Sequence, residues 1–115
     1  MRHHNTKRKF GRETNQRRAL MKSLAVNLIK NDKIKTTEAK AKELRPFIEK
    51  LVTKAKAGDL AKRRTVISAI GILSTKKLFD KIAPKYKDRN GGYTRITKMP
   101  RRKSDGSKIS VIEFV

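Results

Sequence analysis

The segment from Arg89 to Lys98 reads Arg-Asn-Gly-Gly-Tyr-Thr-Arg-Ile-Thr-Lys and combines a glycine pair with two arginines. Its Asn-Gly-Gly triplet predicts a turn, because these residue types adopt positive φ at little steric cost. Gly91 and Gly92 have no Cβ atom, so the backbone there can approach a flat partner such as a sugar-phosphate strand. Arg89 precedes the turn and Arg95 follows it, so a guanidinium lies on either side. Phosphate binding is therefore the expected chemistry. A bare turn without function is the alternative interpretation of the glycine pair.

Residues suited to catalysis or metal binding are few. The chain has no cysteine and only two histidines, His3 and His4, which are adjacent and cannot share a helix face. No carboxylates have the spacing of a metal site, and no glycine-rich loop precedes a helix as in a P-loop. A basic ribonuclease would need a general acid and base, for which the histidines, Glu38 or Glu43 are ungrouped candidates. We therefore expect no enzyme, no metal, no cofactor and no small-molecule substrate.

The charge of the chain indicates the class of its partner. Its 115 residues include 32 Lys and Arg against 10 Asp and Glu, which gives a net charge of +22. Such self-repulsion opposes a compact fold, and nucleic acid is the commonest polyanion that would offset it. The sequence shows no apolar stretch of about 20 residues, no signal peptide and no aromatic amphipathic face for a membrane surface. We expect a cytoplasmic nucleic-acid-binding protein without a membrane partner.

RNA is the nucleic acid that the basic residues favour. They are nearly unopposed in residues 1–18 and 85–108, whereas residues 36–83 mix 12 basic with five acidic side chains. The chain lacks the pattern of a helix-turn-helix protein, and long irregular basic segments with a few aromatics suit folded RNA. A nucleoid-associated DNA-packaging protein is the alternative. The candidate RNA-binding residues are Arg2, His3, His4, Lys7, Arg8, Lys9, Arg12, Arg17, Arg18, Lys22, Lys35, Arg63, Arg64, Lys85, Lys87, Arg89, Gly91, Gly92, Tyr93, Arg95, Lys98, Arg101, Arg102 and Lys103.

Apolar periodicity predicts the elements that position these residues. Residues 1–13 show no periodicity and are expected to form a basic RNA-binding arm that is disordered alone, followed by a single α+β domain over 14–115. Apolar residues at helical spacing predict four helices, and β-branched and aromatic runs predict three strands. The predicted helices span 14 to about 30, 38–57, 60–70 and Ser74 or Thr75 to Pro84, and the predicted strands span 33–37, 93–99 and 108–115.

Helix ends carry recognisable capping residues. Thr14 or Asn15 is expected to cap the first helix, Thr37 the second and Asp59 the third. Pro46 lies inside the second helix and should kink it or restart it.

The last strand decides the predicted layering. Val111-Ile112 and Phe114-Val115 place apolar side chains on both of its faces. A strand of that kind requires cover on both faces. The predicted fold is therefore α+β, with a small three-stranded mixed sheet between helices on both faces (α/β/α layers), in the order helix-strand-three helices-two strands. Residues 100–107 form a basic loop between the last two strands and should project from the sheet.

Several segments, in their order and spacing, also match a known family. They are Met1-Arg-His3, Gly11-Arg12, Arg17 with Ala19-Leu20, Ile34-Lys-Thr-Thr37, Ala39-Lys-Ala-Lys-Glu-Leu-Arg45 and Gly91-Gly-Tyr-Thr-Arg-Ile96. On these residues the chain resembles bacterial large-subunit ribosomal protein seventeen along nearly its full length. The family often has Arg at position 4 and His at 16 and 31, where this chain has His4, Gln16 and Asn31.

The resemblance implies the same order of helices and strands as the pattern analysis. It further implies a structural, non-catalytic role in the large ribosomal subunit, near the mouth of the peptide exit tunnel. The implied partners are ribosomal RNA and neighbouring ribosomal proteins. The implied RNA contacts lie in the arm, at the start of the first helix and in the strand after Gly92.

Overall fold

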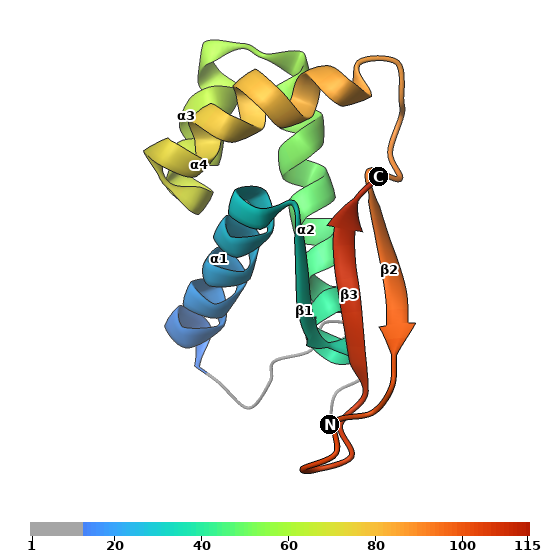
Figure 1. The fold of residues 1–115 in the computed structure, drawn as a ribbon. Coiled ribbons are helices and arrows are strands. Elements are labelled where there is room, and N and C mark those ends of the chain that lie inside the picture. Colours follow the sequence, from blue (N-terminus) through green and yellow to red (C-terminus); the bar gives the residue numbers. More distant parts are fainter. Residues whose placement is uncertain (1–12) are drawn as a thin grey trace, which may run out of the picture.

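The computed structural model describes residues 13–115, so the predicted arm lies outside the described residues except for its last residue. Helix α4, Ile72–Lys77, continues through a π-helical turn, Leu78–Ile82, into a 3-10 turn, Ala83–Tyr86. The order of elements confirms the predicted helix-strand-three helices-two strands (Figure 1). The elements are α1 (Thr14–Asn31), β1 (Lys33–Thr37), α2 (Glu38–Ala57), α3 (Leu60–Ile70), α4 (Ile72–Lys77), β2 (Thr94–Met99) and β3 (Ile109–Phe114).

The three strands form one antiparallel sheet in the order β1-β3-β2. Strands β2 and β3 are joined as the predicted hairpin, and the C-terminal strand β3 lies between the two others. Both β1 and β2 run opposite to β3, so no two neighbouring strands are parallel. The α+β class is confirmed, whereas the mixed sheet was wrong, because β1 and β2 never become neighbours.

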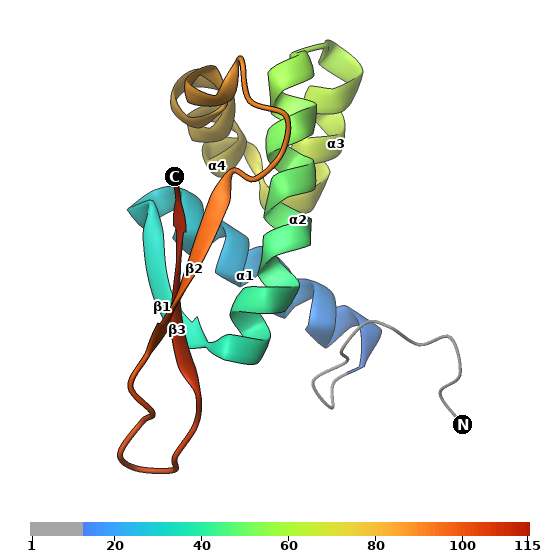
Figure 2. The ribbon, with the colours of Figure 1, turned by 90° about the vertical axis from the view of Figure 1, so that its right-hand side faces the viewer.

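The helices cover only one face of the sheet (Figure 2). Ile34, Ile112 and Ile96 align across the three strands and pack against the core. The expectation of cover on both faces was wrong because it considered β3 alone. Its neighbours place the charged side chains of Lys35 and Arg95 on the far face, and such groups are costly to bury.

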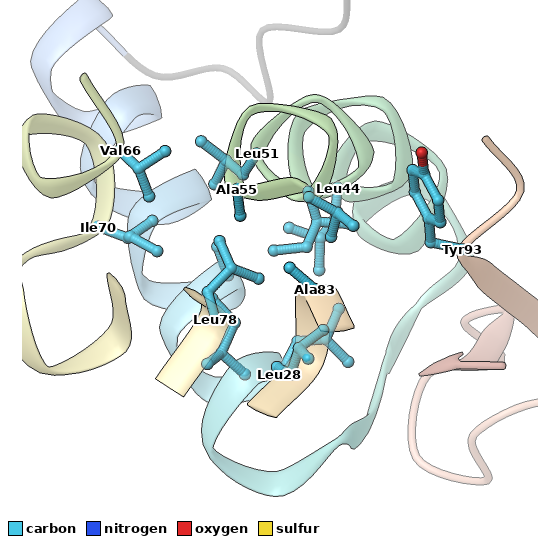
Figure 3. Close-up of a cluster of buried hydrophobic side chains, with 14 of the residues drawn as sticks. Leu28, Leu44, Leu51, Ala55, Val66, Ile70, Leu78, Ala83 and Tyr93 are labelled. Carbon is cyan, nitrogen blue, oxygen red and sulfur yellow. The ribbon is translucent and has the colours of Figure 1, made fainter. Parts of the chain in front are cut away.

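The core lies between α2, the other helices and the covered face of the sheet (Figure 3). Its members include residues of α1, α2, α3, the two turns that follow α4 and the central strand. Leu28, Ile48, Leu78 and Ile112 are examples, and each of these is fully shielded from solvent. Helix α2 supplies the largest share, namely Ala41, Leu44, Ile48, Leu51, Val52 and Ala55. The apolar residues at helical spacing on α2 are thus core residues.

Two of the predicted caps are confirmed. The Thr37 hydroxyl accepts a hydrogen bond from the Lys40 amide at 3.4 Å, and the Asp59 carboxylate accepts one from the Lys62 amide at 2.8 Å. Each satisfies a backbone N–H that the first turn of a helix leaves without a partner. These bonds fix where α2 and α3 begin.

Two other local predictions were wrong, and a third was wrong in part. Glu13 is the N-cap residue of α1 and makes no side-chain capping bond, while Thr14 is already helical. Helix α4 begins at Ile72, and the buried Thr75 hydroxyl donates back to the carbonyl of Gly71 at 2.6 Å. Helix α2 is continuous through Pro46, so the predicted restart is wrong, while the alternative of a kink there stays a prediction. Pro46 lies on an exposed side, where water can satisfy the carbonyl that proline leaves free.

Candidate nucleic-acid interface

The predicted glycine turn is present in the connector, which we define as residues 87–93 between the 3-10 turn and β2. Gly91 and Gly92 have φ values of 85° and 63°, in the region that side-chain-bearing residues rarely adopt. A Cβ atom built on either glycine would meet nothing within 4 Å. Glycine is therefore required there by backbone conformation, and the backbone is open on the side where a Cβ would point.

Tyr93 does not belong to an exposed binding surface. Its side chain is 2% exposed, and its ring centroid lies 5.2 Å from that of Tyr86. Its hydroxyl lies within hydrogen-bond distance of Lys56 Nζ at 3.1 Å and of the Thr53 hydroxyl at 3.5 Å. The hydrogen bond from Thr53 is the main reason that the pKa of Tyr93 is lowered from its ordinary value. The Tyr93 ring is therefore part of the core, and an RNA contact at Tyr93 stays a prediction.

The uncovered side of the sheet, which we call the outer face, is lined by Lys33, Lys35, Arg95, Thr97, Val111 and Glu113. Arg95 donates to one oxygen of Glu113 from Nε at 3.1 Å and from Nη2 at 2.7 Å, across the β2–β3 pair. Lys33 is the register partner of Glu113 on the other side, and Lys35 lies two residues further along β1. Three cations against one carboxylate leave the outer face positively charged.

The loop between β2 and β3, residues 100–108, extends beyond the end of the sheet as predicted (Figure 1), and we call it the basic finger. Its backbone closes on itself through Arg102 N–H to Ser107 O at 3.0 Å and Gly106 N–H to Arg102 O at 2.8 Å. Arg102 also pairs with Asp105 at 3.2 Å. Hydrogen bonds from Ser107 are the main cause that lowers the pKa of Asp105 from its ordinary value. The finger is an ordered, exposed loop.

Helix α1 carries three of the predicted contacts in its first turns. Arg18 and Lys22 are exposed, and Arg17 is half-buried and donates to the Thr14 hydroxyl at 3.2 Å. The start of α1 and the finger lie toward the same end of the molecule (Figure 1). Both can therefore face one extended partner at that end.

Two of the predicted RNA-binding residues, Arg63 and Lys98, interact with other side chains of the chain. The Arg63 guanidinium stacks over the Phe79 ring at 4.9 Å, which fastens α3 to the turn that follows α4. Lys98 lies in the row of residues that faces the helices, and its charge acts on Glu38, whose pKa is lowered chiefly by the hydrogen bond with Lys42. Arg64 is exposed on α3.

The predicted residues do not form one compact patch. Strand β2 separates the glycine turn from the basic finger, so these two features lie at opposite ends of the sheet, about 20 Å apart at the usual rise per residue. Lys85, Lys87 and Arg89 are exposed beside the glycine turn. The outer face joins the two ends. The predicted contacts between Arg2 and Arg12 lie outside the described residues.

Lys33 is a candidate that the sequence analysis missed. It is exposed on the outer face, in the row that also contains Glu113 and Arg95. The signal was available, because side chains of a strand alternate and Lys33 must share a face with Lys35.

Residues 13–115 were also considered for metal-binding groups and membrane-spanning helices, and they contain neither. That part of the chain contains no group of three or more His, Asp or Glu side chains that could hold a metal ion. None of its helices is both long and apolar enough to cross a membrane.

Comparison with known proteins gives one consistent result. The family described as "Ribosomal protein L17" matches residues 20–115. A "Large ribosomal subunit protein bL17" of Hydrogenobaculum sp. (strain Y04AAS1) is 51% identical, with 100% of this chain and 99% of the relative covered. Proteins of the same name from Clostridium acetobutylicum and Sphingopyxis alaskensis are 51% and 52% identical over 94% and 100% of this chain, and over 96% and 84% of their own lengths. The chain belongs to the ribosomal protein L17 family.

Proposed function

We propose that this chain binds ribosomal RNA as a structural constituent of the large ribosomal subunit, through the outer face of its sheet and the features at its two ends. The observation that carries the proposal is the uncovered, positively charged outer face. A sheet face that remains open in a small domain is available to a partner, and its three cations select a polyanion.

The chemistry of the proposed interface is phosphate neutralisation. Lys33 and Lys35 present exposed ammonium groups from β1, while Arg95 is held by Glu113 with its guanidinium still largely exposed. The basic finger extends this surface at one end of the sheet. At the other end the open backbone of the glycine turn permits a close approach of a sugar-phosphate strand.

Family membership makes the chain a ribosomal structural component rather than an enzyme, and its place in the cell is the cytoplasmic ribosome. We further propose that neighbouring large-subunit proteins are its protein partners and that it lies near the exit tunnel, as the family resemblance implies. The relatives described above are ribosomal proteins, so the DNA-packaging alternative has no support from them.

A salt titration tests the proposed interface. Lys33→Gln with Lys35→Gln should weaken binding to purified bacterial large-subunit ribosomal RNA. It should also make the dependence of log affinity on log salt shallower, by roughly 0.7 to 0.9 for each phosphate that is no longer neutralised. The control is Lys50→Gln with Lys76→Gln, which removes the same charge from exposed sites on α2 and α4. Equal slopes for the two double variants would show that the outer face is not the RNA-binding surface.

A further inference from the structure

Three polar side chains on α2 contact the connector and the first residue of β2. Glu49, Thr53 and Lys56 are spaced at i, i+4 and i+7, so they lie along one side of the helix. The Glu49 carboxylate accepts from the Thr94 amide at 3.3 Å and from the Thr94 hydroxyl at 2.9 Å. The Thr53 hydroxyl donates to the Tyr93 hydroxyl at 3.5 Å. We call these three residues the α2 stripe.

Lys56 makes the most direct contact with the connector. Its ammonium donates to the main-chain carbonyl of Arg89 and to the Tyr93 hydroxyl, the latter at 3.1 Å. The same nitrogen lies 5.1 Å from the centroid of the Tyr93 ring. Lys56 therefore bonds to residues on both sides of the glycine turn, Arg89 before it and Tyr93 directly after it.

We propose that Lys56, supported by Glu49 and Thr53, is a positioning residue that holds the Gly91–Gly92 turn in its RNA-binding conformation. This inference rests on the proposed function. Two glycines in succession have the most backbone freedom to lose on ordering, so an unsupported turn would give up much of that freedom only when RNA binds. Fixing the turn beforehand removes that cost from binding.

The bonding of Lys56 distinguishes positioning from direct phosphate contact. Its ammonium has three donors and already serves a carbonyl oxygen and a phenol oxygen, while its stem is partly buried against the body. The turn that it supports is open to the outside, whereas Lys56 itself is turned toward the connector. Replacing Lys56 should thus change the order of the turn rather than the number of phosphates neutralised.

The test compares Lys56→Met, which keeps the aliphatic stem, with Lys56→Arg and with the control Lys50→Met on the exposed side of the same helix. Amide hydrogen exchange of the free full-length protein measures the order of residues 89–93. Lys56→Met should accelerate exchange there about tenfold, with the other elements unchanged, because local opening no longer breaks the Lys56 bonds. Lys56→Arg should restore most of the protection, and Lys50→Met should have no effect on it.

Binding to purified bacterial large-subunit ribosomal RNA gives the second readout. Lys56→Met should weaken affinity about fivefold more than Lys50→Met, which has the same net charge, and the two variants should have equal salt slopes. Unchanged exchange at residues 89–93 would overturn the positioning role. If Lys56→Met exchanges faster at residues 89–93 but binds RNA as tightly as Lys50→Met, order in the turn does not contribute to RNA binding. If the dependence of log affinity on log salt becomes shallower in Lys56→Met but not in Lys50→Met, Lys56 contacts a phosphate directly.

Failure of the proposed function and failure of the positioning role give different results. If the unsubstituted protein fails to bind this RNA, the proposed function is wrong, while the exchange measurement still decides whether Lys56 orders the turn. If Lys56→Met does not fold, Lys56→Gln keeps a neutral donor and is measured in its place with the same expected directions.

Discussion

The helical side of the molecule and the outer face of its sheet are built on different principles. On the helical side, apolar residues at helical spacing converge on one core, and several charges are neutralised locally, as in Lys42 with Glu38 and Lys77 with Asp32. On the outer face, cations outnumber the single carboxylate of Glu113. Burial determines the structure of the first region, whereas the second keeps an excess of positive charge even after Arg95 pairs with Glu113. We propose that a polyanionic partner offsets this charge.

Adjacent residues of β3 give the largest expected contrast between the two regions. Ile112→Ala should lower the free energy of unfolding by about 2 to 5 kcal/mol, because it leaves a cavity among fully buried side chains. Val111→Ala, one residue away on the outer face, should cost about 1 kcal/mol or less, since Val111 is only half-buried. Chemical denaturation of both variants measures the difference, and similar destabilisation would mean that the outer face is covered after all.

Valine substitutions at Gly91 and Gly92 should have the next largest effect. A β-branched residue at these φ values is strained, so each variant should be less stable by about 1 to 3 kcal/mol and bind RNA more weakly. Gly71→Val is the matched control, because Gly71 also has positive φ (87°) and open space but lies between α3 and α4. Thermal melting and RNA titration check both. Equally weakened binding in Gly71→Val would show that strain alone, and not the site of the turn, reduces affinity.

The basic finger should affect binding without affecting the fold. Changing Arg101, Arg102 and Lys103 together to Ala should alter stability by no more than about 0.5 kcal/mol each, because all three are exposed. RNA affinity should fall and its salt dependence should become shallower, because fewer phosphates are neutralised. A marked drop in melting temperature would show that these side chains pack on the body, and unchanged binding would show a solvated loop.

The smallest expected effect concerns pH. The pKa of Asp105 is lower in the folded protein, so its contribution to stability is present above its unfolded pKa and is lost as pH falls through the folded pKa. A carboxyl titration followed by NMR should give a midpoint below 3.8, the ordinary value for this group. Ser107→Ala should raise that midpoint if the loop is ordered as described. A midpoint at or above 3.8 in the unsubstituted protein would contradict the ordered finger.

Local signals in the sequence predicted the elements well, because the residues that decide them are neighbours in the chain. Thr37 and Asp59 cap helices whose first turns follow directly, and the strand from 33 to 37 has the predicted bounds. The hairpin strands were placed to within one residue, since glycines, Pro100 and the Asp105-Gly106 turn delimit them.

Features that depend on distant partners could not be predicted. The position of β3 between β1 and β2 follows from pairings across the whole chain, and so does the uncovered outer face. The sequence pattern places Tyr93 at the start of the predicted strand whether its side chain points inward or outward. Its burial depends on packing against Tyr86 and Lys56, which are distant from the strand in the sequence or lie on another element. Arg63 looks like any other exposed cation until Phe79 is placed beneath it.

Lysine acetylation in the presence and absence of RNA tests whether the outer face is the RNA-binding surface. Lys33 and Lys35 on the outer face and Lys50 and Lys76 on the helices are all exposed in the free protein, so each should be modified before RNA is added. On binding purified bacterial large-subunit ribosomal RNA, Lys33 and Lys35 should become protected, as judged by mass spectrometry, while Lys50 and Lys76 remain reactive. Protection of the helical pair with continued modification of Lys33 and Lys35 would contradict the assignment of the outer face as the RNA-binding surface.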